Sequence, residues 1–387
     1  MKHLFLSFLL ALTSSSTILG FVASPRSKKS PSGGATSSFS SPTRNSKTQL
    51  CQTWSDSKAV MDYQNFLASG KQEIERKDDG PSIIVSEGPN EMADCLLAMG
   101  KGDDVVLTRH DSLPSELAGR TEYPIYICLP PSELEDFLRN LSDNFKQRNE
   151  DFVFFSGGTY FGNIEDLLKG FGYCRDTMTQ VLATGIEFLP QASKVKDLSV
   201  KLGADAMGEQ KWAGECAACG KWNGAIGKRM ENSEVRCSVD FYRDWRRKMW
   251  ERNAYDAIFP LIGCVREEST TIFEVAEYYE EETSDMLWEV SGSLRGWKAI
   301  TLLFGFEERV FGIAENRGSG KECKIDETMF PYIYGNRVFS DSPMVNEYLW
   351  YAKDNFGIFK DAELPPKKAG SGKSIMRKGN LRADGVV

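Results

Sequence analysis

The chain has 387 residues, of which 41% are hydrophobic and 26% are charged, and its formal net charge at pH 7 is −8. This length is enough for two domains that each bury a core of their own. The acidic balance argues against nucleic-acid binding, because an acidic surface repels phosphate backbones. His110 is the one histidine beyond residue 3, so metal centres and catalytic triads that depend on histidine are nearly excluded.

The first 54 residues have the composition of a targeting leader. Residues 1–20 place Lys2 before an apolar run, which predicts a signal peptide. Residues 21–54 begin with Phe21 and contain basic but no acidic side chains, which is typical of a transit peptide. The two-part leader resembles those of algae with secondary, red-type plastids, and this resemblance implies the plastid (chloroplast) stroma as the location. The alternative is a secreted protein with a flexible basic stalk.

Residues 81–190 alternate short strands with helical stretches. Runs of β-branched or aromatic residues predict strands at 83–85, 105–108, 125–129, 152–155 and 181–188. This alternation predicts a parallel α/β sheet of the Rossmann type.

After a predicted hinge at 190–207, residues 208–360 have the apolar periodicity of an all-helical domain. Helices are expected near 212–230, 245–261, 272–282, 284–294 and 297–306, with a last one near Tyr348. Residues 361–387 are rich in Lys, Gly, Ser and Pro and predict a disordered tail. No stretch beyond the leader approaches 18 apolar residues, so we expect no transmembrane segment.

A nucleotide-binding turn is predicted where the first strand ends. In a dinucleotide-binding βαβ unit the pyrophosphate lies on a glycine-lined turn at a helix N-terminus. The candidate binding residues here are Ser86, Gly88, Pro89 and Asn90. Only Gly88 fits the G-x-G-x-x-G pattern, and Glu91 stands at the third glycine, where its charge would repel a phosphate.

Arg109 follows the second predicted strand. NADP-preferring Rossmann domains have an arginine at this place, and it binds the adenosine 2′-phosphate. NADP is therefore the predicted cofactor. The alternative is a solvated arginine in a loop.

The order of elements resembles ketopantoate reductase and its plastid-located relatives. The matching segments are 151–158, 220–239 and 259–263, and the resemblance covers roughly residues 81–350. It implies an α/β Rossmann-like N-terminal domain followed by an all-α 6-phosphogluconate dehydrogenase-like C-terminal domain. It also implies an NADP-dependent oxidoreductase that acts on a small acid between the two domains.

The catalytic residues expected from that family are largely replaced. Its Gln-Asn-Gly turn after the fourth strand is here Ser156 followed by Gly157 and Gly158, and these two glycines are the remaining candidates for cofactor contact. The family has a catalytic lysine and two asparagines at i+4 and i+8. The residues that align with them here are Glu251, Tyr255 and Phe259, so all three are replaced.

A shift by one position offers Arg252 as the catalytic cation and Asn253 as the amide. A ketoacid reductase needs a cation or an acid to stabilise the developing alkoxide. Two functions remain open: an NADP-dependent oxidoreductase with a small-molecule substrate, or a non-catalytic binding or assembly protein with a plastid protein partner. A homodimer is compatible with both.

The sequence contains a single C-x-x-C, formed by Cys216 and Cys219. It lacks the strand-to-helix context of a redox motif and the regular spacing of a zinc site. We therefore expect no metal, and interpret the pair as small thiols that pack within a helix. A regulatory thiol pair is the alternative.

Overall fold

The computed structural model describes residues 76–173, 178–183, 216–233, 235, 237–266, 269–317 and 320–368. The chain divides into two units, Met1–Cys51 and Gln52–Val387, and every described residue belongs to the second. The predicted signal peptide, transit peptide and hinge, and the tail beyond residue 368, lie outside the described residues.

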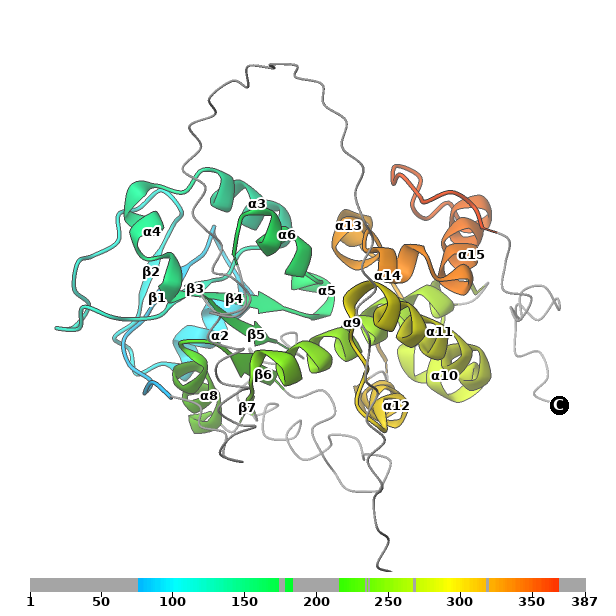
Figure 1. The fold of residues 1–387 in the computed structure, drawn as a ribbon, viewed down its shortest axis with the longest axis horizontal. Coiled ribbons are helices and arrows are strands. Elements are labelled where there is room, and N and C mark those ends of the chain that lie inside the picture. The colour runs from blue at the N-terminus through cyan, green and yellow to red at the C-terminus, as the bar shows by residue number, and fades with distance from the viewer. Residues whose placement is uncertain are drawn as a thin grey trace, which may run out of the picture. The chain divides into compact units, whose positions relative to one another are not determined.

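A seven-stranded sheet organises the first half of the described chain, in the order β2-β1-β3-β4-β5-β6-β7 (Figure 1). The strands are β1 (Ile83–Val85), β2 (Val105–Leu107), β3 (Ile125–Ile127), β4 (Phe152–Ser156), β5 (Thr179–Leu182), β6 (Cys216–Cys219) and β7 (Cys237–Val239). The first five are parallel, whereas β6 is antiparallel to β5 and parallel to β7. The predicted fold class, a Rossmann-like sheet followed by helices, is confirmed.

Helices cover both faces of the sheet because side chains alternate along each strand. The helices around the sheet are α2 (Glu91–Met99), α3 (Pro131–Arg139), α4 (Asp143–Gln147), the 3-10 turn η2 (Asn149–Asp151), α5 (Gly158–Phe161), α6 (Glu165–Gly170) and α8 (Asn223–Asn232). Ile84 of β1 packs with α2 and α8, whereas its neighbours Ile83 and Val85 pack with α3, α4 and α6 on the other face.

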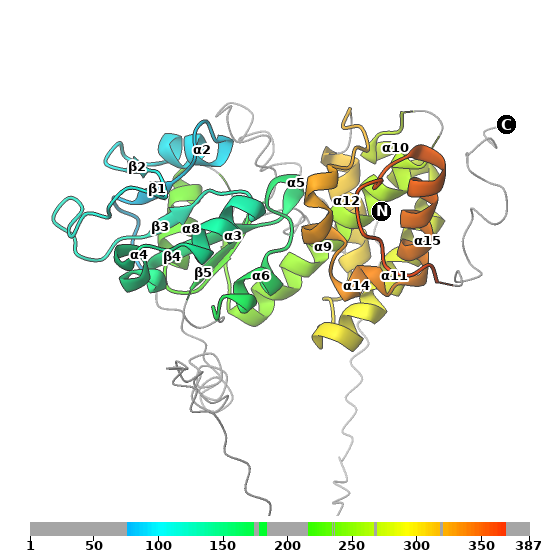
Figure 2. The same ribbon diagram turned by 90° about the horizontal axis from the view of Figure 1, so that it is seen from above.

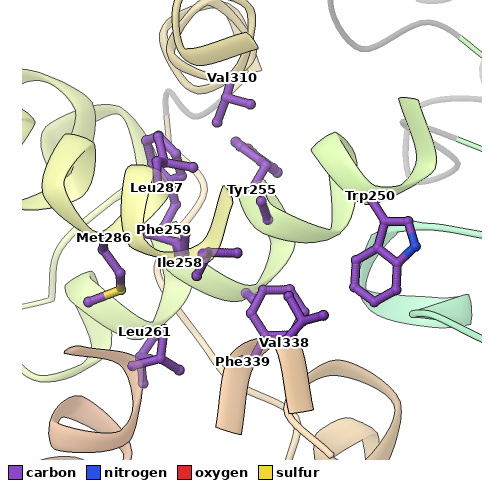
Figure 3. Close-up of a cluster of buried hydrophobic side chains, with 14 of the residues drawn as sticks. Trp250, Tyr255, Ile258, Phe259, Leu261, Met286, Leu287, Val310, Val338 and Phe339 are labelled. Carbon is purple, nitrogen blue, oxygen red and sulfur yellow. The ribbon is translucent and has the colours of Figure 1, made fainter. Parts of the chain in front are cut away.

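The second half is helical and is built around α9 (Tyr242–Cys264), which reaches from the sheet into the other helices (Figure 2). Near its start, the indole Nε1 of Trp245 donates to the carbonyl of Ala217 in β6 (3.0 Å). Farther along, Ile258 and Phe259 lie in a buried apolar cluster with Leu287 of the helix Glu280–Lys298 (Figure 3). The remaining elements are α10 (Ile272–Tyr278), α11 (Glu280–Lys298), α12 (Phe306–Arg317), η4 (Glu327–Met329), α13 (Phe330–Ile333), α14 (Arg337–Ser340), α15 (Pro343–Tyr351) and the π-helical turn η5 (Ala352–Phe356).

None of the helices in the described residues combines the length and the apolar character that a membrane crossing requires.

The helix expected near 212–230 is wrong at residues 216–222, and residues 212–215 lie outside the described residues. Residues Cys216–Cys219 form strand β6, and the helix begins only at Asn223. Gly220, with φ of +95°, makes the turn between them. Strands β6 and β7 extend the sheet to Val239, so the predicted helical domain from residue 208 begins with sheet elements; the boundary itself stays a prediction.

Two further expectations need correction. The helix expected at 297–306 does not form, because α11 ends at Lys298 and Ala299 adopts the left-handed conformation, with φ of +52°. Residues 361–368, assigned to a disordered tail, lie against α15 instead. The indole Nε1 of Trp350 donates to Pro365 O (2.9 Å), and Lys368 N donates to Asn346 Oδ1 (2.8 Å).

Candidate functional site

The predicted nucleotide-binding turn lies at the point where the strand order reverses. Within the sheet, β2 pairs with one edge of β1, and the next strand along the chain, β3, pairs with the other edge of β1. In open α/β sheets, ligands bind in the crevice outside the carboxyl ends of the strands at such a switch point. The turn from Ser86 to Asn90 follows the carboxyl end of β1 and leads into α2.

Gly88 is the residue of this turn whose backbone conformation favours glycine. Its φ is +76°, and a Cβ added there would meet no heavy atom within 4 Å. The open space lets a ligand approach the backbone closely. The Ser86 hydroxyl donates to Gly88 O (3.1 Å), and Pro89 has no N–H, so the turn presents fewer donors than a glycine-rich one.

Asn90 is the N-cap of α2, and its side chain fills the helix N-terminus. Its Oδ1 accepts from the backbone N–H groups of Met92 (3.0 Å) and Ala93 (3.1 Å). Its Nδ2 donates to Cys128 O at the end of β3 (2.6 Å) and to the hydroxyl of Tyr160 (2.7 Å). A phosphate at a helix N-terminus binds to free N–H groups, and two of these are already taken.

Arg109 lies two residues after β2 and beside the same turn, and it has an acidic partner there. Oε1 of Glu87 accepts from the backbone N–H of Arg109 (3.0 Å) and lies 3.5 Å from its Nε. The Arg109 side chain is 32% exposed and the Glu87 side chain 25%, so solvent weakens the attraction between their charges. The sequence analysis missed this pair, because Glu87 precedes Arg109 by 22 residues and belongs to another strand's loop.

Gly157 and Gly158 form the turn after β4, and both have positive φ values, +95° and +70°. The N–H of Gly158 donates to Oδ2 of Asp256 in α9 (2.8 Å). Asp256 is a second residue that the sequence analysis missed. The available signal was its position four residues after Arg252, the spacing at which helical side chains meet.

Arg252, the predicted catalytic cation, is brought to this turn. It is buried, its Nε donates to both carboxylate oxygens of Asp256 (3.1 and 3.3 Å), and its guanidinium lies 4.6 Å from the ring centre of Tyr255. Its Cγ lies 3.8 Å from the point where a Cβ of Gly157 would be. The carboxylate of Asp256 offsets much of this positive charge, because a buried site screens the attraction between the two groups poorly.

Asn253 makes a different contact. It is buried, and its Nδ2 donates to the sulfur of Met249 (2.8 Å), one turn earlier in α9. Its predicted role as the amide of the catalytic set stays a prediction.

The three positions aligned with the family's lysine and asparagines belong to the protein's framework. Glu251 receives two hydrogen bonds from Arg309 (2.8 and 2.7 Å). Burial raises the pKa of the Glu251 carboxyl, although Arg309 opposes the shift. The rings of Tyr255 and Phe259 pack against each other, with centres 5.1 Å apart. None of these side chains replaces a catalytic lysine.

Cys216 and Cys219 are both buried, but they point to opposite faces of the sheet. Cys216 packs with α8, and Cys219 packs with α9, as expected for residues three apart in a strand. Burial raises the pKa of the Cys219 thiol well above its usual range, which makes it a poor nucleophile. Their interpretation as packing residues agrees with this geometry, although they lie in a strand and not in a helix. Among the described residues, no three His, Cys, Asp or Glu side chains are grouped to hold a metal ion.

Solved structures show only a low similarity to the chain. A D-mandelate dehydrogenase in complex with NADH is 11% identical, with a TM-score of 0.41, over 70% of this chain and 97% of that chain. The 2-dehydropantoate 2-reductase from Methylococcus capsulatus is 11% identical, with a TM-score of 0.45, over 73% and 98%. A dimeric ketopantoate reductase from Staphylococcus aureus is 11% identical, with a TM-score of 0.39, over 70% and 97%.

At these identities and TM-scores the similarities establish no family, and the fold class rests on the strand order. No family model matches the chain, and no curated protein sequence is similar to it.

Proposed function

We propose that the protein is a divergent oxidoreductase of the ketopantoate reductase-like type, which binds a nicotinamide dinucleotide at the β1–α2 turn and acts on a small acid. The observation that supports this most is the position of Arg252, a buried cation held against the Gly157–Gly158 turn at the carboxyl end of β4. Asp256 offsets part of its charge, and the guanidinium would stabilise an alkoxide as a hydrogen-bond donor. The proposal covers NADP and NAD, because Arg109, predicted for the 2′-phosphate, is already paired with Glu87.

A second function is favoured by one specific observation. The side chain of Asn90 occupies two N–H groups at the start of α2, where a pyrophosphate would bind. Glu91 and Asp94 add negative charge to the same helix turn. A non-catalytic binding or assembly protein, derived from a nucleotide-binding fold, does not need to bind a pyrophosphate. These features would therefore not impair its function.

The experiment that separates the two functions is a titration of the protein with NADH and NADPH, followed by nicotinamide fluorescence and by thermal unfolding. We expect binding to the wild-type protein. Gly88→Asp should weaken it about tenfold or more, because the new carboxylate would face the pyrophosphate in the open space at this turn.

The matched control is Gly102→Asp. Gly102 also has a positive φ, +86°, with open space at the Cβ position, so the backbone strain is equivalent, but it lies in the loop before β2. Binding by this variant should equal that of wild type. Equal weakening in both variants would place the ligand elsewhere, and no binding to the wild-type protein would favour the non-catalytic function.

We also propose that the protein acts in a plastid, on the basis of the acid-free leader. A fluorescent protein fused after residue 60 should enter the plastid of a host with secondary plastids, and Phe21→Ala should divert it to an outer compartment. Fluorescence microscopy of the two fusions tests this. Import that is indifferent to the substitution would argue against the leader assignment.

A further inference from the structure

Two carboxylates and one guanidinium lie where the β1–α2 turn meets the loop after β2. Arg109 is its basic residue beside the β1 turn, and Glu87 Oε1 reaches it from that turn. In the same loop, Asp111 accepts from the N–H (2.7 Å) and the hydroxyl (2.8 Å) of Thr108. These bonds lower the pKa of the Asp111 carboxyl, with the backbone bond as the larger cause. Two carboxylates therefore share this corner of the sheet with one guanidinium.

The carboxyl end of β2 is where Rossmann domains distinguish the two nicotinamide dinucleotides. A carboxylate there accepts hydrogen bonds from the adenosine ribose hydroxyls, whereas an arginine accommodates a 2′-phosphate. Glu87 belongs to the β1–α2 turn, yet its carboxylate lies 3.0 Å from the backbone nitrogen of Arg109, two residues after β2 ends. Both contacts use Oε1, so among the described residues Oε2 is left to accept from a hydroxyl.

We propose that Glu87 determines the dinucleotide specificity of this site. Its carboxylate accepts hydrogen bonds from the ribose hydroxyls and repels a 2′-phosphate, while Arg109 orients the carboxylate. The protein therefore binds NAD and NADH more tightly than their phosphorylated forms, the reverse of what Arg109 alone predicts. This inference rests on the proposed function, since it assumes that a dinucleotide binds at the β1–α2 turn.

The test compares the Kd values of NADH and NADPH in the wild-type protein and in Glu87→Gln, by nicotinamide fluorescence. The glutamine keeps an oxygen for the Arg109 N–H and removes the charge. We expect the wild-type protein to favour NADH, and the variant to shift the ratio of the two Kd values about tenfold or more towards NADPH, because the released guanidinium can pair with phosphate. Adding Arg109→Ala to the variant should abolish the shift.

Glu91→Gln is the matched control. It removes one charge from the first turn of α2, where Glu91 is exposed, without touching Arg109. It should change the affinity for NADH and NADPH by the same factor, since both contain the pyrophosphate. Thermal unfolding of each variant confirms that the fold is retained.

The outcomes separate the inference from the proposed function. A wild-type protein that favours NADPH, or a Kd ratio that is the same in Glu87→Gln, overturns the role of Glu87 while the function stands, because dinucleotides still bind. If no variant binds either dinucleotide, both the inference and the oxidoreductase function are overturned.

Discussion

Replacing Arg229 with methionine should destabilise the protein by about 3–5 kcal/mol, which is the range for removing one partner from a buried ion pair. Arg229 lies on α8 and is fully buried. Its removal would leave two carboxylates, those of Asp79 and Asp104, without their cation in the interior. Methionine has a similar length and keeps the apolar packing, so the loss reports the uncompensated charge.

The contacts of Arg229 explain the size of this effect. Its Nε donates to Asp79 (3.0 Å), its Nη1 and Nη2 donate to Asp104 (both 3.0 Å), and Nη2 also donates to Gly80 O (2.9 Å). The guanidinium lies 5.2 Å from the ring centre of Tyr126. One side chain thus joins α8 to the segment before β1 and to the loop before β2.

Urea unfolding, followed by tryptophan fluorescence, measures the loss. The control is Lys228→Met, at the adjacent position of α8, where an exposed lysine pairs with Glu231. Exposed pairs contribute about 0–1 kcal/mol, so this variant should unfold close to wild type. Arg229→Met could instead keep the wild-type urea midpoint. The carboxylates of Asp79 and Asp104 would then be hydrated or protonated in the variant, and the ion pairs would not be required for folding.

Much of the sheet could be predicted from local sequence. Apart from Ser156 at the end of β4, the strands β1, β3 and β4 consist of Ile, Val, Phe and Tyr between turn residues, and all their residues are buried. The long helix α9 was predicted from its apolar periodicity. Both signals depend on neighbours along the chain, which a single sequence displays directly.

The strand β6 could not be predicted in this way. Its residues, Cys-Ala-Ala-Cys, are small and not β-branched, and their spacing fits a helix as well as a strand. Its conformation is set by its pairing with β5 and β7. A four-residue segment is too short to show a hydrophobic periodicity from which such tertiary pairing could be predicted.

The candidate site shows the same limit. The sequence placed Gly88, Arg109, Gly157 and Arg252 at the ends of strands or on α9, and the structure brings Arg252 to the Gly157 turn. The acidic partners were missed: Glu87 is 22 residues from Arg109, and Asp256 is 98 residues from Gly158. Such partners decide the charge of the site. The i,i+4 spacing of Arg252 and Asp256 was a usable signal, but only the folded chain reveals the contacts of Glu87 with Arg109 and of Asp256 with Gly158.

Gly220→Ala should be as damaging as the loss of Arg229, for a steric reason. Gly220 connects β6 to α8 with φ of +95°, and an added Cβ would lie 2.2 Å from Met178 O and 2.7 Å from Thr179 Cα. Both contacts are with backbone, which cannot rotate away as a side chain could. Left-handed strain and overpacking together give an expected destabilisation of about 3–5 kcal/mol.

Gly119→Ala separates strain from clash in this prediction. Gly119 has a similar φ, +77°, but a Cβ there would meet nothing within 4 Å. Its alanine variant should lose only the left-handed penalty, about 1–2 kcal/mol. Urea unfolding of both variants gives the clash as the difference between them. Equal losses would mean that the segment at Met178 and Thr179 shifts to admit the methyl group, so that the clash adds nothing to the strain.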